Sequence, residues 1–503
     1  VFSGTEADGH GHHQASGILS REAFHAAADP SRFPEQLGAV EPWQAVRLMQ
    51  GGFRRAAGGP SIEINAKAVD PVLGLSYADI AAMSRSMHRS QGMSHPERRR
   101  AGTNTVTLLA GEPVKGSLFD GIDTTWRRLP GGAHAGELIE RAVREFEPSQ
   151  PGRVLPLLAE ARRQAAALRH PWADIKLREL DDAIALCAGI AVEAISSTPV
   201  AVPGDTMQVG LQATNSSPEA VVIRRIAVEG SSGVLVEDNG DFTLPAGGNV
   251  RRDLKFAVPQ DEPYSQPYWL RRPRTSDFYE VEDEGLIGLA ETPPSLRARC
   301  RIDTNSGQID IVCPVTAADV HSESPLPLAV TPPVSVRFRE PAVVFVDGSS
   351  KVLSVAITSN GGEESGELHV EAPTGWRAEL PSREFRIRGQ GEESVLPVTV
   401  TPPAAGGAAV LQAFACTGGS KVSTETRTLR YPDLRPQTVF LPASTKVVRA
   451  DVRTLARNVG YITGAGDGIP HALEQMGCAV TLLDATELSR GDLTRFDAIV
   501  AGV

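Results

Sequence analysis

The chain has 503 residues, of which 41% are hydrophobic, 22% are charged and only 5% are aromatic, and its formal net charge is −11. This composition is typical of a globular protein with about three or four domains of ~100–200 residues each. Because an acidic chain gains no general electrostatic attraction to nucleic acid or to an anionic membrane, neither is expected as a partner.

The sequence holds no run of about 18 apolar residues, so it predicts no transmembrane segment. It starts at Val1 rather than at a methionine, shows no signal peptide, and ends in "RFDAIVAGV", which is typical of a buried strand cut at its last residue. We therefore expect the natural protein to continue in both directions.

The five cysteines include no CxxC pair, so neither a zinc ribbon nor a thioredoxin motif is expected. Cys300 and Cys313 lie in one β-rich stretch. Both a disulfide and two buried thiols are open interpretations of this pair.

The first expected domain covers residues 1–196. The segment "HHQASGILSREAFHAAADP" has apolar residues at roughly helical spacing and predicts a helix that ends at Pro30. A second helix is predicted from Ser76 to Gly92, with Ser76 as N-cap and Asp79 completing a weak capping box.

Residues 134–196 are strongly helical and predict two antiparallel helices at the end of this domain. Their apolar residues recur at spacings of three and four. In the second helix, the expected apolar face consists of Leu180, Ile184, Ala188, Ala191 and Ile195.

From Ser197 the sequence alternates apolar and polar residues between proline- and glycine-rich turns, which predicts strands. Two similar blocks, one around Asn215 and one around Asn360, suggest tandem β-sandwiches. We place these at residues 197–326 and 327–432, joined by "ESPLPLAVTPP".

Residues 433–503 predict the start of a parallel α/β sheet, in the order strand, glycine-rich turn, helix, strand, connection and strand. The turn "TGAGDGIP" has the spacing G-x-G-x-G and not the G-x-G-x-x-G of a dinucleotide site. A tight turn into a helix is the favoured interpretation.

The stretch "GHGHHQASG", residues 9–17, places three histidines directly before a predicted helix. Imidazole is the commonest neutral metal ligand, and a catalytic zinc site uses three protein ligands. The pattern alone therefore predicts at most half of a metal site, and a purification tag or a surface histidine cluster is the alternative.

Residues 1–196 resemble the C-terminal part of the PIG-L/LmbE-like de-N-acetylase family. The resemblance rests on "DGHGHHQASG", on "VLGLSYADIAAMSRSMHRSQGM" and on "SLFDGIDTTW" (Ser117 to Trp126). It implies a Rossmann-like α/β domain and a zinc-dependent amidase that removes acetyl groups from N-acetylglucosaminyl and related substrates.

The family's second motif is usually His-Pro-Asp-His, and the segment His10 to His13 matches it in place. The resemblance implies that His13 is a Zn²⁺ ligand and that His10 lies by the substrate and stabilises the oxyanion. His12 stands where the family has an orienting aspartate, and Gly11 replaces the proline.

The family's first motif, Ala-His-Pro-Asp-Asp-Glu, supplies the other two zinc ligands and the general base, and it does not occur in this chain. We therefore expect residues 1–503 to be inactive alone, even if the parent protein is an active deacetylase.

Four further residues are candidates for the substrate cleft. The family resemblance makes His88 and Gln91 candidates for this cleft, and Arg85, one turn from Arg89, is a candidate to face an anionic or sugar ligand, although a solvated face is the favoured interpretation for the arginines. The alternatives are a helix-end histidine bonded to backbone carbonyls and a solvated arginine face. Asp8 is either a cleft residue or a turn former, and the turn is favoured.

Residues 433–503 resemble the opening of a class I glutamine-amidotransferase-like domain of flavodoxin-like fold, cut before the position of its nucleophile. In this domain Cys478 starts an apolar strand and is expected in the core. The sandwich at 327–432 resembles domains appended to secreted glycosidases, which implies a periplasmic or secreted location.

The leading hypothesis is a multidomain bacterial zinc-dependent deacetylase acting on an N-acetylated amino sugar or glycoconjugate. A non-catalytic carbohydrate-binding or scaffold protein, in which the sandwiches carry the function, is the alternative. A third possibility is an amidotransferase-type enzyme centred on the C-terminal domain.

Overall fold

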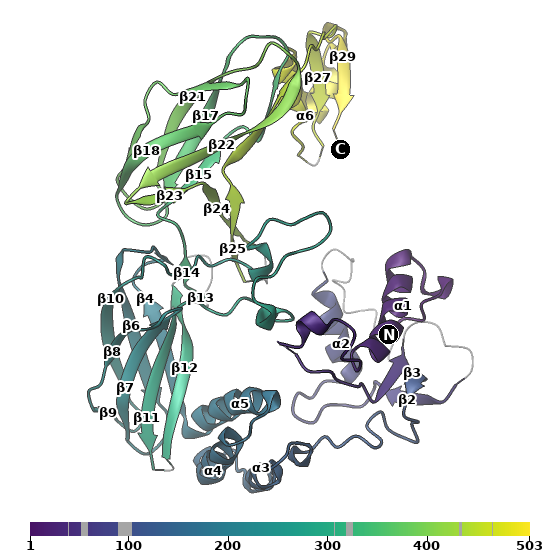
Figure 1. Ribbon diagram of the computed structural model, residues 1–503, viewed down its shortest axis with the longest axis vertical. Helices are drawn as coiled ribbons and strands as arrows, with labels where there is room; N and C mark the ends of the chain where they lie inside the picture. The colour runs from purple at the N-terminus through teal and green to yellow at the C-terminus, as the bar shows by residue number, and fades with distance from the viewer. Residues whose placement is uncertain are drawn as a thin grey trace. The chain divides into compact units, whose positions relative to one another are not determined.

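The structure is a computed structural model that describes residues 1–38, 40–51, 59–88, 103–305, 307–317, 325–431, 435–464 and 466–502. It is mixed α and β, with several separate sheets (Figure 1). The chain divides into two compact units, Val1–Glu137 and Leu138–Val503. Within the described ranges, no helix is long and apolar enough to span a membrane.

The described part of the first unit contains the helices α1 and α2 and a small sheet. Its elements in chain order are η1 (Glu6–Asp8), α1 (Gly11–Ala26), η2 (Pro34–Gln36), β1 (Arg47–Gln50), β2 (Ser61–Asn65), α2 (Tyr77–Ser86), β3 (Thr103–Gly111) and η4 (Trp126–Arg128). The pairs β1–β3 and β2–β3 are both antiparallel. A Rossmann-like domain is built on parallel strands, whereas the described strand pairs of this unit are antiparallel. The Rossmann-like expectation for residues 1–196 is therefore not confirmed and stays a prediction.

Both helices expected in this unit are confirmed. α1 ends shortly before Pro30, as its sequence predicts. α2 begins after Ser76, whose Oγ accepts a hydrogen bond from the backbone N–H of Asp79 at 3.1 Å, while the Asp79 carboxylate accepts one from the N–H of Ser76 at 3.3 Å. This reciprocal pair satisfies two backbone donors that the first helical turn leaves free. The helix ends at Ser86, and the expected end at Gly92 lies outside the described residues.

The helical segment continues with α3 (Ala133–Glu145), η5 (Pro151–Val154), α4 (Leu155–Ala166) and α5 (Pro171–Ala188). α4 and α5 pack on each other, and α5 also contacts the neighbouring sheet. The expectation that the last helix includes Ala191 and Ile195 is wrong. Gly189 adopts a left-handed conformation with φ 66°, which ends α5, and β4 (Ile190–Ser196) follows at once.

The first β-rich domain is a nine-stranded sheet in the order β10-β6-β4-β12-β11-β7-β8, with β13 on β12 and β9 on β7. Its strands are β4, β6 (Thr206–Asn215), β7 (Val221–Gly230), β8 (Gly233–Asp238), β9 (Phe242–Leu244), β10 (Asn249–Ala257), β11 (Arg297–Thr304), β12 (Gly307–Ala317) and β13 (Leu326–Pro327). Because β4 pairs with β6 and β12, this domain begins at Ile190, before the expected boundary at residue 197.

Short elements accompany this sheet. They are η6 (Tyr268–Leu270), η7 (Glu284–Leu286), and the parallel pair of β5 (Val200–Ala201) with β14 (Ala329–Val330).

Cys300 and Cys313 lie on the adjacent antiparallel strands β11 and β12. Cys300 is opposite Ile311, and Cys313 is opposite Ala298, so the two cysteines are diagonal neighbours. Diagonal Cα atoms lie roughly 7–8 Å apart, beyond the usual span of a disulfide. Both are free thiols, and burial raises the pKa of Cys300 to about 12 and that of Cys313 to about 11. The structure therefore supports the interpretation of two thiols and not that of a disulfide.

The second β-rich domain is a sandwich of two sheets around an apolar core that includes Val336, Phe345, Ile357 and Leu411. One sheet has the order β15-β17-β21-β19, and the other has β16-β26-β22-β18-β20 with β23 on β22. The strands are β15 (Val334–Phe338), β16 (Ala342–Phe345), β17 (Lys351–Ser359), β18 (Glu364–Glu371), β19 (Arg377–Glu379), β20 (Glu384–Ile387), β21 (Glu393–Thr401), β22 (Gly407–Thr417), β23 (Ser420–Val422) and β26 (Ser444–Arg449). Because β26 is part of it, the sandwich extends past the expected boundary at residue 432. A separate ribbon pairs β24 (Thr424–Leu429) with β25 (Gln437–Pro442).

The C-terminal segment is a parallel three-stranded sheet in the order β28-β27-β29, as the sequence predicts. Its elements are β27 (Asn458–Ile462), α6 (Ile469–Gln475), β28 (Ala479–Leu483), α7 (Ala485–Arg490), η8 (Leu493–Arg495) and β29 (Ala498–Ala501). Cys478 is buried at the start of β28, as expected.

Candidate functional site

The three histidines lie together at the N-terminus of α1. His10 is the N-cap residue and uses its side chain for no capping hydrogen bond. Its ring centroid lies 3.9 Å from that of His13 and 5.6 Å from that of His12. His10 and His12 are exposed and His13 is half-buried. The helix start therefore brings all three imidazoles into one cluster, as the sequence predicts.

The His13 ring is held from two directions. Its Nδ1 atom lies 3.0 Å from the backbone oxygen of Asp8, and its ring stacks on Phe2 with centroids 4.2 Å apart. A hydrogen bond to a carbonyl places the proton on Nδ1 and leaves Nε2 as the lone-pair nitrogen. Metal-binding histidines in proteins are oriented in this way.

The Asp8 side chain organises the turn before the histidines. Its carboxylate accepts hydrogen bonds from the backbone N–H groups of Ser3 (3.0 Å), Gly4 (2.7 Å) and Thr5 (3.2 Å). Desolvation raises the pKa of Asp8, but these bonds outweigh it and the pKa lies below its usual value. Asp8 is thus a turn former, which was the favoured interpretation, and its backbone oxygen positions His13.

The other cleft candidates lie in α2 or follow it in the sequence. Arg85 lies in the last turn of this helix, and His88 follows its end, where the His88 N–H donates to the Arg85 carbonyl at 3.0 Å. Gln91 lies outside the described residues. The described contact of His88 is local to its own helix end, and no contact between His88 and the histidine cluster is described.

Among the described residues of this cluster, only the His13 side chain is oriented as a metal ligand. His13 has the orientation of a ligand, but no group of three His, Cys, Asp or Glu that could hold a metal occurs in the described part of the chain. The residues that the structure describes thus offer a single oriented ligand, with His10 next to it.

A cavity of about 300 Å³ opens at the other end of α1. Its lining includes Ala23, Arg32, Phe33 and Trp43. None of the three clustered histidines lines it, so this cavity is separate from the histidine cluster.

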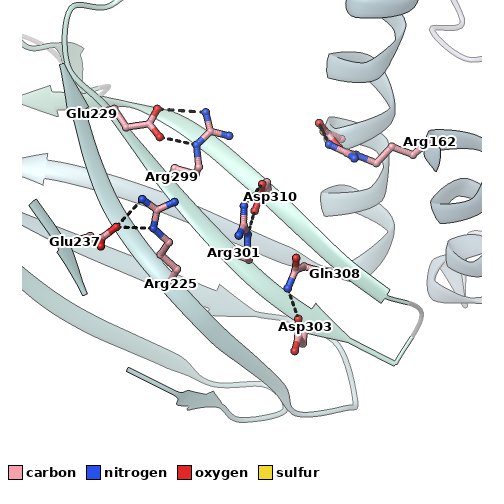
Figure 2. A network of polar contacts seen from close by, with 10 residues as sticks. Arg162, Arg225, Glu229, Glu237, Arg299, Arg301, Asp303, Gln308 and Asp310 are labelled. Carbon is pink, nitrogen blue, oxygen red and sulfur yellow. Dashed lines mark hydrogen bonds and ion pairs between the residues drawn. The ribbon is translucent and has the colours of Figure 1, made fainter. Parts of the chain in front are cut away.

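Paired charges cover one face of the first β-rich domain (Figure 2). Arg299 and Glu229 form a bidentate pair at 2.7 and 3.2 Å, and Arg301 and Asp310 form another at 2.9 and 3.1 Å. Arg162 of α4 pairs with Asp181 of α5. Each of these charges thus has a partner of opposite sign, on the sheet or on the helix pair α4–α5, and together they form a network of ion pairs.

Sequence reasoning missed Arg47, the first residue of β1. Its guanidinium donates to backbone carbonyls of the loop after β3, including those of Leu118 and Asp120. The only sequence signal was indirect, because this loop carries the "SLFDGIDTTW" motif.

No family model and no curated protein matches the chain. Among solved structures, a Porphyromonas gingivalis W83 protein of unknown function is 15% identical, with 52% of this chain and 99% of that one covered and a TM-score of 0.16. Red sea bream transglutaminase is 13% identical over 56% of this chain and 34% of its own length, with a TM-score of 0.24. Escherichia coli alpha-2-macroglobulin activated by porcine elastase is 12% identical over 52% and 22%, with a TM-score of 0.18. At TM-scores of this size, the similarities assign neither a fold nor a family to this chain.

Proposed function

We propose that this protein is a zinc-dependent deacetylase of the PIG-L/LmbE-like type, which hydrolyses the N-acetyl group of an amino sugar or glycoconjugate. The observation that carries the proposal is the orientation of His13. Its Nδ1 atom is bonded to the Asp8 carbonyl at 3.0 Å, which directs the Nε2 lone pair away from the turn. Metal-ligating histidines in proteins usually donate their other ring N–H to such a partner.

In this proposal, the three clustered histidines have different roles. His13 holds the metal, and the Asp8 carbonyl fixes its tautomer. His10, whose ring centroid lies 3.9 Å from that of His13, donates a hydrogen bond to the acetamide oxygen as negative charge develops there. His12 contacts the edge of the His10 ring and orients it. When bound, zinc polarises the carbonyl and supplies an activated water.

In this proposal, residues 1–503 supply one metal ligand and no general base. We therefore expect these residues alone not to catalyse deacetylation. It also includes an extracytoplasmic location, where N-acetylated glycoconjugates are exposed and where the two β-rich domains act as accessory modules.

The test is the zinc content of the natural full-length protein, measured by elemental analysis after dialysis. We expect about one zinc per chain in the wild type, none in His13→Ala, and about one in His25→Ala. His25 is a matched control because it is an exposed histidine of the same helix.

Absence of zinc from the wild type, or equal zinc in His13→Ala, would contradict the proposal. The carbohydrate-binding or scaffold alternative would then be the one to pursue, starting with glycan binding by the β-rich domains.

A further inference from the structure

The loop between β3 and η4 displays an exposed aromatic side chain. Phe119, the phenylalanine of the "SLFDGIDTTW" motif, is 63% exposed. Full burial of such a ring would be worth roughly 1.5–3 kcal/mol, and Phe119 gains only part of this in the described structure.

Arg47 holds the backbone on both sides of Phe119. Its Nη1 atom donates to the carbonyl of Leu118 at 2.6 Å, and its Nη2 atom donates to that of Asp120 at 2.5 Å. Its Nε atom also donates to the Glu112 carbonyl at 3.2 Å. One guanidinium, anchored in β1, thus fixes the residues directly before and after Phe119.

The Asp120 side chain holds the part of the loop that precedes Phe119. Its Oδ2 atom accepts hydrogen bonds from the backbone N–H groups of Lys115 (2.7 Å), Gly116 (2.7 Å) and Ser117 (3.0 Å). These bonds lower the pKa of Asp120 to about 2. The Phe119 N–H donates to Ser117 Oγ at 3.1 Å, so the backbone of Phe119 itself is bonded as well.

The arrangement is preorganised, and preorganisation lowers the entropy cost of binding. The surroundings of Phe119 indicate what binds. The exposed residues near it in the sequence are small, polar or charged, namely Lys115, Gly116, Ser117, Gly121, Asp123, Thr124 and Thr125. A stable protein interface buries about 800 Å² on each partner, whereas one aromatic side chain offers only about 150–250 Å². One aromatic face in a loop of small, polar and charged residues matches a ligand with one apolar face and many hydroxyls, which is a sugar ring.

We propose that Phe119 is a stacking platform for a pyranose ring of the substrate glycan, held in place by Arg47 and Asp120 as positioning residues. This inference rests on the proposed deacetylase function, because that function supplies the amino sugar as ligand. β1 links the two sites, since Arg47 begins this strand and the Met49 carbonyl of the same strand lies 2.8 Å from the backbone nitrogen of Val1, which precedes Phe2, the residue whose ring stacks on His13.

The test is the binding of N,N′-diacetylchitobiose and its trimer to the full chain, measured by calorimetry and by saturation-transfer NMR. We expect Phe119→Ala to weaken binding by about tenfold and Phe119→Trp to retain or improve it. Phe278→Ala is the matched control, because Phe278 is an exposed phenylalanine (77%) in the other unit, and it should leave binding unchanged.

Arg47→Lys tests the positioning role. A lysine keeps the charge but lacks the fork that spans the Leu118 and Asp120 carbonyls. We expect a loss of affinity close to that of Phe119→Ala, together with faster amide exchange at Ser117 and Ile122. Equal affinity in Phe119→Ala and wild type, or no binding of either saccharide by the wild type, would overturn the platform.

The zinc experiment separates this inference from the proposed function. If zinc binding requires His13 but saccharide affinity is the same in wild type and Phe119→Ala, only the stacking platform is refuted. Saccharide binding that depends on Phe119 in a protein without zinc would refute the deacetylase and leave a sugar-binding loop.

Discussion

The Nδ1 atom of His13 lies 3.0 Å from the backbone oxygen of Asp8, which comes five residues earlier in the chain. The Asp8 side chain holds the same turn through three backbone N–H groups. Asp8, for which a role in the turn was the favoured interpretation, thus forms that turn through its carboxylate, and its backbone oxygen contacts the His13 ring.

This contact predicts the tautomer of His13. Because a carbonyl oxygen only accepts, neutral His13 carries its proton on Nδ1, whereas a free imidazole prefers Nε2. Long-range nitrogen–proton NMR spectra should show the Nδ1–H pattern for His13 and the Nε2–H pattern for the exposed His25. An Nε2–H pattern for His13 would remove the oriented ligand from the proposed site.

Asp120 predicts a pH dependence of the loop that carries Phe119. Its folded pKa of about 2 lies below the value of about 3.9 in an unfolded chain. The stabilisation is therefore complete above the unfolded pKa and is lost as the pH falls through the folded value.

We expect the amide exchange protection of Gly116 and Ser117 to be constant from pH 7 down to about pH 4 and to fall between about pH 4 and 2, after correction for intrinsic exchange. In Asp120→Asn the protection should be low and flat across this range. A wild-type decline centred near pH 4 would show that these hydrogen bonds do not favour the carboxylate.

The Arg299–Glu229 pair predicts a measurable but small coupling energy. The pair is bidentate, and its side chains are 32% and 15% exposed. A double-mutant cycle, read from hydrogen exchange of β11 amides, should give about 1 kcal/mol at low salt and about half of that in 1 M NaCl. Arg386 and Glu363, which are 75% and 58% exposed, form the control pair and should show no measurable coupling. A coupling energy that is the same at low salt and in 1 M NaCl would mean that packing, and not charge, dominates the interaction.

The sequence predicted features that depend on local chemistry. The capping box at Ser76 and Asp79 and the parallel order around β27 belong to this class. Features with distant partners could not be predicted, because Arg47 contacts backbone carbonyls 65 to 73 residues away, and backbone carbonyls leave no mark in a sequence. The histidine cluster was visible because its members lie within four positions.

The error at the end of α5 has a local cause. Ala191 and Ile195 fit helical spacing, but β4 buries the alternate residues Ile190, Val192 and Ala194 instead. Apolar residues on both sides of Gly189 therefore satisfied two periodicities, and the glycine decides between them. With φ 66° and ψ 29°, it stops α5 and turns the chain into the sheet.

Gly189→Ala should therefore destabilise the junction of α5 and β4 by about 1–2 kcal/mol, because an L-residue pays for the left-handed conformation. The new Cβ would also lie 3.2 Å from the backbone nitrogen of Ser217, which is a tight contact. Gly189→Asn should cost less, since asparagine tolerates this region. Gly152→Ala is the matched control, because a Cβ at that nearby glycine meets only ordinary contacts at 3.7 and 3.8 Å. Hydrogen exchange of the last turn of α5 and of β4 measures the loss. Equal protection in Gly189→Ala and Gly152→Ala would mean that the sheet pairing of β4 with β6 and β12, and not the glycine, ends the helix.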